Sequence, residues 1–258
     1  MFTWRHFVWL AISAVMIFLA VSTFKKKRMS LQSLLNYCVA ICICSEFIKV
    51  FSTVRLVPSL NGTIMHPYIP MNHLPLHLCS LQILLIFYVR FTNNTKMRES
   101  VLAFMYPTCI CGAIAALLMP SIFTTTIPVE KAFVHPQAYQ FFIYHSMLVT
   151  LGICIPLSKE IEWTKKHLYS TWIIMLTLGF VDIYVNSIFA SPTYVDGVLQ
   201  HVDFWPNFMF VYDNPLGIPM TKLWHWYLYL AILLTLMFGL SSAFILPLLK
   251  KKEKKSVE

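Results

Sequence analysis

Two histidines and a cysteine lie close together at the start of a long apolar run. They are His73, His77 and Cys79, in the segment HLPLHLC. A cysteine near a histidine can lose its proton, attack an ester carbonyl and carry the acyl group as a thioester. The histidine can accept the thiol proton and return a proton to the leaving alcohol. Because proton-transfer groups at membrane depth are costly and usually functional, this segment is a candidate site for acyl transfer.

The cysteine needs a base from another part of the chain. Residues 77 and 79 lie about 200° apart around a helix, so His77 and Cys79 would not face each other there. His145 lies about two turns inside another apolar run, at a matching depth when helices rise about 1.5 Å per residue. We therefore predict Cys79 as the nucleophile and His145 as its base.

Other polar residues are expected at the same depth, in the outer half of the membrane. Asp182 and Asn186 fall in the last two turns of the sixth apolar run, and Arg55 falls at the end of the second. With His77, they are predicted to bind the substrate. Asn186, or another amide donor, is predicted to stabilise the oxyanion that forms during acyl transfer.

Structural roles are the alternative for each of these residues. His145 can bond a neighbouring carbonyl, and Asp182 with Asn186 can form an interhelical hydrogen bond. Arg55 can mark the headgroup level with an extended stem. Glu46 and Lys49 are three residues apart and are predicted to pair on one helical face.

A metal centre is not predicted. His73 and His77 have the i, i+4 spacing of helical metal ligands, but the sequence offers no third ligand beside them. The chemistry of a cysteine and a histidine also requires no cofactor, and none is predicted.

The composition indicates an integral membrane protein. Of 258 residues, 58% are hydrophobic and 12% charged, and the mean hydropathy is +0.66. Soluble domains carry about 25% charged residues. The net charge of +9 is not expected to bind nucleic acid, since the basic residues flank apolar runs. The seven cysteines predict no disulfide framework, because most lie inside these runs.

The apolar runs predict an all-α fold, a polytopic bundle of about seven transmembrane helices in a single domain over residues 1–258. Each run reaches or approaches the ~20 residues that cross a bilayer. The stretch 191–222, rich in aromatic residues and prolines, is predicted to form an interfacial cap. The expected helices span residues 3–24, 31–57, 74–91, 100–119, 138–157, 168–190 and 223–249.

The basic residues predict the orientation of the bundle. Most of the 20 lysines and arginines follow the first, third, fifth and seventh runs, which lead to the same side of the membrane. Because cytosolic loops carry the excess of positive charge, the N-terminus is expected outside and the C-terminus in the cytosol. We expect a multi-pass protein, of the plasma membrane in a bacterial host.

Several short motifs resemble those of the YwaF-type family of integral membrane proteins. They are Leu74-Pro75-Leu76-His77-Leu78-Cys79, Phe141-Phe142-Ile143-Tyr144-His145, and Asn207-Phe208-Met209-Phe210 followed by Pro215 and Trp226-Tyr227. Animal relatives of that family are cysteine acyltransferases that move fatty acyl chains between phospholipids without coenzyme A. The resemblance implies a multi-helix bundle in which Cys79 is the nucleophile, a histidine such as His145 is its partner, and Asn207 belongs to the site.

The leading hypothesis from the sequence is therefore a lipid acyltransferase or transacylase in lipid metabolism, with membrane phospholipids as substrate and solvent. A transporter or channel-like bundle with a path of buried His, Asp and Glu groups is the alternative. That class often shows inverted repeats and broken helices near the midplane. No repeat is evident here, and the chain has only seven glycines. A small receptor or assembly factor, in which Cys79 is incidental, is the third possibility.

Overall fold

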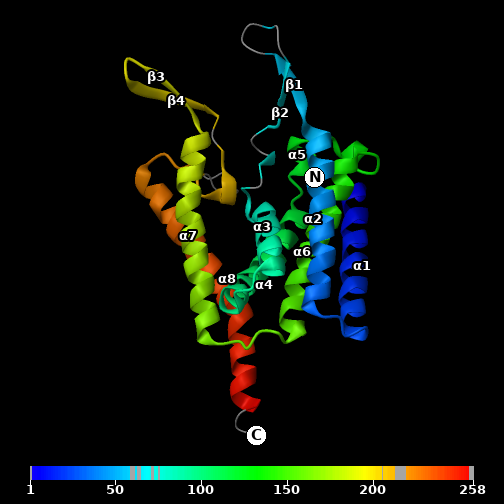
Figure 1. The fold of residues 1–258 in the computed structure, drawn as a ribbon. Helices are drawn as coiled ribbons and strands as arrows, with labels where there is room; N and C mark the ends of the chain where they lie inside the picture. The colour runs from blue at the N-terminus through cyan, green and yellow to red at the C-terminus, as the bar shows by residue number, and fades with distance from the viewer. Residues whose placement is uncertain are drawn as a thin grey trace. The chain divides into compact units, whose positions relative to one another are not determined.

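The computed structural model describes residues 2–58, 62, 65–70, 73–74, 76–204, 206–212 and 219–255, and these are predominantly helical, as predicted (Figure 1). The bounds of the longer helices agree with six of the predicted runs. The helices are α1 Trp4–Lys26, α2 Leu31–Thr53, α3 Leu78–Phe91, α4 Thr95–Leu118, the short α5 Ile122–Thr125, α6 Pro136–Ser158, α7 Lys165–Phe189 and α8 Leu223–Lys255.

Six helices in the described part of the chain are long and apolar enough to cross a membrane: α1, α2, α4, α6, α7 and α8. The third predicted run differs, because α3 has only 14 residues and begins at Leu78 rather than 74. At about 1.5 Å per residue it is roughly 21 Å long, shorter than the ~30 Å hydrocarbon core. Leu74 precedes a proline, and a residue before proline disfavours helical geometry. His77 therefore precedes the helix instead of lying inside it. Asn72 and Pro75, at the predicted start of this run, lie outside the described residues.

Two small antiparallel hairpins interrupt the helical pattern. Strands β1 Arg55–Pro58 and β2 Met65–Tyr68 follow α2, so Arg55 begins a strand instead of ending a helix. Strands β3 Ser191–Val195 and β4 Val198–Phe204 follow α7, within the stretch predicted as an interfacial cap. Asp196 and Gly197 form the turn between them with φ of 51° and 75°. Such positive values suit an Asp-Gly turn.

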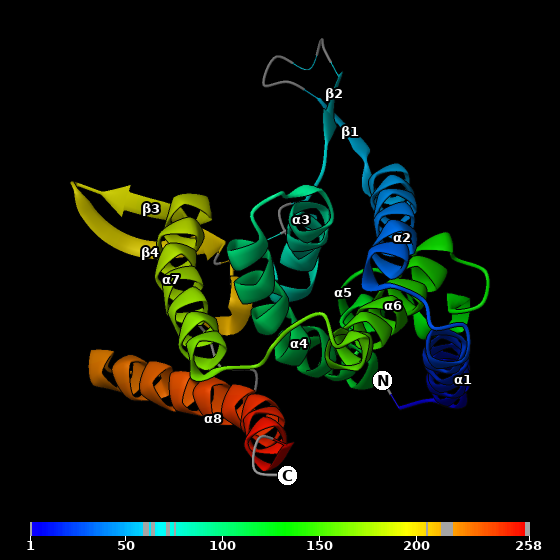
Figure 2. The same cartoon turned by 60° about the horizontal axis from the view of Figure 1, so that its bottom comes forward.

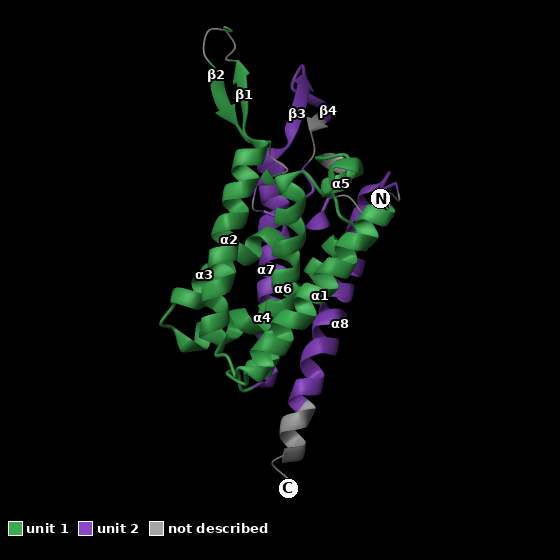
Figure 3. Ribbon diagram, turned by 90° about the vertical axis from the view of Figure 1, so that its right-hand side faces the viewer, with its two compact units in different colours: residues 1–73, 79–162 green, residues 74–78, 163–258 purple. Residues whose placement is uncertain are grey.

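Contacts divide the chain into two compact units, coloured separately in Figure 3. Unit 1 comprises residues 1–73 and 79–162, and unit 2 comprises residues 74–78 and 163–258. The single-domain prediction stays a prediction.

In unit 1, α6 packs against α1, α2 and α4 (Figure 2). Trp9 of α1 stacks on Phe142 of α6 with ring centroids 4.7 Å apart. Gly152 of α6 allows α4 to come close, because a Cβ there would lie 2.6 Å from Cγ1 of Ile110. Small residues at helix contacts permit this kind of close backbone approach in membranes. The helix that carries His145 is thus fixed by packing on several sides.

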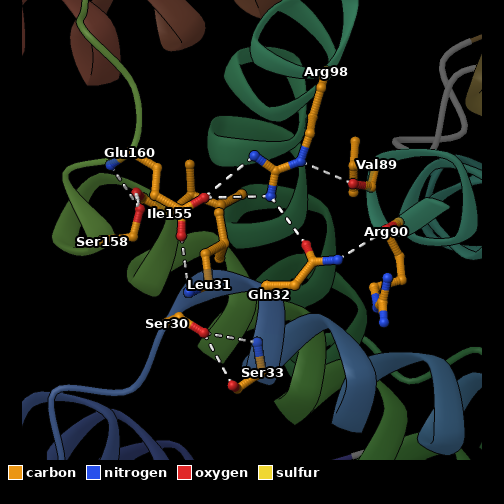
Figure 4. A network of polar contacts seen from close by, with 10 residues as sticks. All are labelled: Ser30, Leu31, Gln32, Ser33, Val89, Arg90, Arg98, Ile155, Ser158 and Glu160. Atoms are coloured by element: carbon orange, nitrogen blue, oxygen red, sulfur yellow. Dashed lines mark hydrogen bonds and ion pairs between the residues drawn. The ribbon is translucent and has the colours of Figure 1, made fainter. Parts of the chain in front are cut away.

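One end of unit 1 is held by a polar network around Glu160 (Figure 4). The Glu160 carboxylate accepts the backbone N–H of Leu31 at 3.0 Å and pairs with Arg98 at 3.2 Å. Arg98 also donates to the Val89 carbonyl at 2.9 Å. Gln32 bonds the carbonyl of Arg90 at 3.1 Å. These bonds join the start of α2, the end of α3, the start of α4 and the segment after α6.

The same network bears on the predicted orientation. The ends it joins include Arg98, Arg90 and the segment after Lys159, all in loops predicted to be cytosolic. Arg90 and Arg98, two of the basic residues that predict the orientation, therefore lie at the same end of unit 1. Which side of the membrane this end faces stays a prediction.

In unit 2, α7 and α8 pack together, and Trp172 of α7 lies 5.4 Å from Phe238 of α8 between ring centroids. Thr164 caps α7 in a reciprocal arrangement with His167. The segment after β4 contains the 3₁₀ helix η3, Phe208–Phe210, which contacts α7. This segment carries the Asn207 motif.

Candidate functional site

Cys79 occupies the first turn of α3 and is half-buried. The first backbone N–H groups of a helix have no carbonyl partner within the helix, and they favour negative charge at that end. A thiolate, or an oxyanion formed beside it, would therefore meet N–H groups in this turn. This position differs from the one predicted, one to two turns inside a longer helix.

Tyr144 joins α6 to the Cys79 residue. Its hydroxyl donates to the Cys79 backbone carbonyl at 2.6 Å. Tyr144 is 4% exposed, so the bond is shielded from solvent. Cys79 is thereby tied to the helix of the predicted base.

His145 directly follows Tyr144 and is 7% exposed. Its Nδ1 lies 2.7 Å from the Phe141 carbonyl. Because a carbonyl can only accept, Nδ1 carries a proton, and Nε2 of the neutral ring is left as an acceptor. The predicted bond to a neighbouring carbonyl therefore exists, and it leaves one nitrogen suited to a general base.

No hydrogen bond among the described residues joins Cys79 to His145. Their direct contact stays a prediction, and Tyr144 is the observed link between the two segments. Catalytic hydrogen bonds are often long without substrate and tighten when it binds.

A second polar group on α3 lies one turn beyond Cys79. Gln82 is fully buried and donates to the Thr108 hydroxyl of α4 at 3.0 Å. The Cys109 thiol donates to the Gln82 side-chain oxygen at 3.3 Å. Sequence reasoning missed Gln82, although a buried amide three residues after Cys79 shares its helical face.

In unit 2, Asn186 holds the backbone of Phe208 from both sides. Its side-chain oxygen accepts the Phe208 N–H at 2.8 Å, and its amide donates to the Phe208 carbonyl at 3.3 Å. The same amide donates to the backbone oxygen and the carboxylate of Asp182, at 2.8 and 2.9 Å. Asn186 is fully buried and Asp182 is 4% exposed. The amide protons of Asn186 are thus engaged in structure and are not available to an oxyanion in this arrangement.

Two more predicted residues join the same cluster. The His77 ring packs edge-on against Phe208 with centroids 5.2 Å apart. The Asn207 side-chain oxygen accepts the N–H of Tyr212 at 3.1 Å. Four of the five predicted substrate-binding residues, His77, Asp182, Asn186 and Asn207, therefore gather around Phe208. Their role in binding substrate stays a prediction.

The backbone next to this cluster is strained. Met209 and Phe210 both have positive φ, 50° and 60°, a conformation that side chains with a Cβ rarely adopt. Trp226 donates to the Val211 carbonyl at 2.9 Å, and Tyr229 donates to the Phe210 carbonyl. A strained backbone of this kind persists where neighbouring contacts hold it in place, and it is often found near functional sites.

Arg55, the fifth predicted residue, belongs to unit 1 and is exposed. The predicted pair of Glu46 and Lys49 is confirmed, with their charged atoms 2.6 Å apart. His73 follows the β1–β2 hairpin. Burial, and then the positive charges of Lys49 and Arg55, lower the pKa of His73 below its usual value. Three basic residues therefore influence one another near the end of α2.

Within the described part of the chain, no three His, Cys, Asp or Glu residues are grouped as metal ligands would be.

Comparison with curated proteins and with solved structures gave no significant match. A family model does match, over residues 1–242. The matched range includes five of the six candidate membrane spans in full, most of the span in α8, and both polar clusters. The chain therefore belongs to the TMEM164 family, a family of transmembrane proteins.

Proposed function

We propose that this protein is a membrane-embedded acyltransferase that moves fatty acyl groups between phospholipids through a thioester on Cys79. The observation that carries the proposal is the tie between the first turn of α3 and α6, in which Tyr144 holds the Cys79 carbonyl at 2.6 Å. It connects a half-buried thiol at a helix N-terminus to the segment that carries a histidine with an accepting Nε2.

In the first half-reaction, Nε2 of His145 takes the Cys79 thiol proton, directly or through one water. The thiolate attacks the carbonyl carbon of a phospholipid ester. First-turn N–H groups of α3 stabilise the negative oxygen that develops. The carbon–oxygen bond then breaks, His145 returns the proton to the leaving oxygen, and a lysophospholipid departs.

In the second half-reaction, the hydroxyl of another lysophospholipid attacks the thioester. His145 takes the hydroxyl proton, the new ester forms, and the Cys79 sulfur leaves and regains a proton. No electrons are transferred and no cofactor is consumed. Only the acyl group changes its partner.

The contacts of the two acids within apolar helices, Glu46 and Asp182, favour this proposal over the transporter alternative. A path for protons or substrate needs acidic groups that can bind and release the proton or the substrate. Glu46 is paired with Lys49, and the Asp182 carboxylate accepts from Asn186. Both acids therefore have a structural partner. We further propose that the first turn of α3 lies towards the outer leaflet and that, if the host is bacterial, the membrane is its plasma membrane.

The proposal is tested with purified full-length protein in lipid nanodiscs that contain a phospholipid with a labelled acyl chain. The wild type should accumulate a labelled acyl group that hydroxylamine removes, and Cys79→Ser should lose it, because a serine without a strong base is a far weaker nucleophile. His145→Ala should slow transfer by about 10²–10⁴-fold, the usual contribution of a positioned base.

Cys111→Ser is the matched control, since Cys111 lies on α4 and is also half-buried. It should keep wild-type labelling. If the wild type never traps a labelled acyl group and lipid exchange is equal in wild type and Cys79→Ser, the acyltransferase proposal fails.

A further inference from the structure

A groove opens on unit 1 between α2 and α3, with a volume of about 390 Å³. On α2 it is lined by residues between Cys42 and Phe51, and on α3 by Ile83 and Phe87. This α2–α3 groove has the size of ligand pockets, which range over roughly 300–1,000 Å³. Its lining is almost entirely apolar, with Glu46 as the single charged member.

The shape of the groove follows from side-chain size. The lining includes the small side chain of Cys42, which is fully buried. Phe47 and Phe51 pack together beside it with ring centroids 4.4 Å apart. A small buried residue flanked by aromatic rings suits a narrow flexible chain rather than a wide helix.

The groove continues the face of α3 that carries Cys79. Cys79, Ile83 and Phe87 are spaced four residues apart, so they form one row along the helix. Each step along the row is about 6 Å at 1.5 Å per residue. Tyr144, which bonds the Cys79 carbonyl, lies on α6, and α6 packs against the helix α2 that lines the groove. The candidate nucleophile therefore lies at the end of the row where α3 begins.

Positive charge is concentrated where α2 ends. Lys49 lies on α2 between the groove residues Glu46 and Val50, and Glu46 pairs with it. Arg55 follows in β1, and His73 is influenced by both cations. The two permanent positive charges of Lys49 and Arg55 outweigh the one carboxylate of Glu46, so the local field favours an anion.

We propose that the α2–α3 groove binds one acyl chain of a phospholipid, with the lipid phosphate at Lys49 and Arg55. This deepens the proposed function and rests on it. A phospholipid combines a phosphate, an ester and an apolar chain, and unit 1 provides two cations, Cys79 and an apolar groove. Non-specific lipid would cover every exposed apolar surface equally. Specific binding would instead place an acyl chain in the groove more often than on the neighbouring face of α3.

The test uses full-length protein in phosphatidylcholine nanodiscs, with a trace of phosphatidylcholine that carries a photoactivatable diazirine in mid-chain. Mass spectrometry locates the crosslinks. Labelling is expected at groove residues such as Ile83 and Phe87, several-fold above Leu84, which is adjacent but 59% exposed on another face. The wild-type map alone can overturn the proposal: equal labelling of groove residues and Leu84 would mean non-specific lipid contact.

Two substitutions test the shape of the groove. Ile83→Trp should fill it and reduce groove labelling several-fold, whereas Leu84→Trp should leave the labelling unchanged. A further experiment places the diazirine on the protein, in the groove. Crosslinks between two protein chains would then show that a second copy of the chain occupies the groove, and this outcome would also overturn the proposal.

The phosphate is tested with a diacylglycerol probe that carries the same chain. It should label the groove several-fold less than the phosphatidylcholine probe, and Lys49→Gln should remove that difference. Lys131→Gln, an exposed lysine of unit 1, should preserve it. Equal labelling by both probes in the wild type would refute the phosphate site.

The labelling is also repeated on Cys79→Ser, because binding does not require the thiol. Groove labelling without any acyl-cysteine in the wild type would support the groove and refute the acyltransferase. Acyl transfer that Ile83→Trp and Leu84→Trp alter equally would support the acyltransferase and refute the groove.

Discussion

The hydroxyl of Tyr144 donates a 2.6 Å hydrogen bond to the backbone carbonyl of Cys79, and so joins α6 to the first turn of α3. The contact involves the main chain of Cys79, so it sets where the residue lies while leaving the thiol free to react. His145 follows Tyr144 directly, and a change at Tyr144 would therefore displace nucleophile and base relative to each other.

Tyr144→Phe is expected to lower kcat for acyl transfer and to leave KM nearly unchanged. Removal of one buried hydrogen bond costs about 0.5–1.5 kcal/mol in stability, which the bundle should tolerate. Because Tyr144 is proposed to position Cys79, the loss should affect the chemical step and not lipid binding. Initial rates of labelled-chain exchange, measured over a range of phospholipid concentrations, give both constants.

Tyr139→Phe is the control for that measurement. Tyr139 is on the same helix, and its hydroxyl donates to the Phe133 carbonyl at 2.7 Å, away from Cys79. Its rates should match the wild type. If both variants lose activity equally, the tie to Cys79 has no special role.

Gly152→Ala is expected to destabilise unit 1. The added Cβ would lie 2.6 Å from the Ile110 side chain and 3.1 Å from the Tyr106 carbonyl, so α4 and α6 must move apart. Overpacking of this kind costs about 1–3 kcal/mol. The midpoint of thermal unfolding in detergent should fall.

Gly179→Ala provides the matched comparison in α7, where an added Cβ meets nothing within 4 Å. Alanine is favoured over glycine inside a helix by about 0.5–1 kcal/mol, so this variant should be neutral or slightly more stable. A lower midpoint for Gly179→Ala than for Gly152→Ala would contradict the packing argument.

Asn186→Ala is expected to loosen the segment 206–212 of unit 2. The substitution leaves the Phe208 N–H without its partner and removes one donor to the Phe208 carbonyl, which still accepts the Val211 N–H. Each buried polar group without a partner costs about 1–3 kcal/mol, and the strained backbone at Met209 and Phe210 would relax. Hydrogen exchange of the segment should accelerate strongly. Thr235→Ala, which removes only a bond within α8, should not change it.

The long helices were predictable because an apolar run of bilayer length has few other folds available. The start of α3 was not, because a proline suits the first turn of a helix, so Pro75 was compatible with a start near residue 74. The β3–β4 hairpin was missed although Asp196-Gly197 is a strong turn signal. The high aromatic content of this stretch instead led to the prediction of a cap at the membrane surface.

The candidate site was predictable in part. A cysteine and histidines in an apolar run stand out by residue type alone, and so do Asp182 and Asn186. Tyr144 and Gln82 do not stand out, because a single tyrosine or glutamine in a helix has no signature until its partner on another helix is known. The clustering of His77 with Asn186 depends on the fold of residues 206–212, which no periodicity describes.

The pKa of His73 is expected to rise when Lys49 is replaced by glutamine. Burial lowers this pKa most, and the positive charges of Lys49 and Arg55 lower it further, so removing one charge should move it part of the way towards the usual value. Glu46 loses its partner in this variant, and its negative charge would act in the same direction. Histidine NMR in nanodiscs, with the signal assigned by His73→Gln, measures the shift. Lys131→Gln should leave it unchanged.

The same shift predicts how stability depends on pH. The unfolded chain has a His73 pKa near 6.5, and the folded value is lower, so the unfolded chain takes up its proton first as the pH falls. Folding is therefore unaffected by His73 above about pH 6.5 and is progressively weakened below it, until the folded group also protonates. His73→Gln should flatten this part of the profile between pH 7.5 and 5 in thermal unfolding. Because Lys49→Gln raises the pKa of His73 in the folded protein, it should also reduce the loss of stability that His73 causes at low pH. A steeper loss of stability in that variant would contradict the role of Lys49 in lowering the His73 pKa.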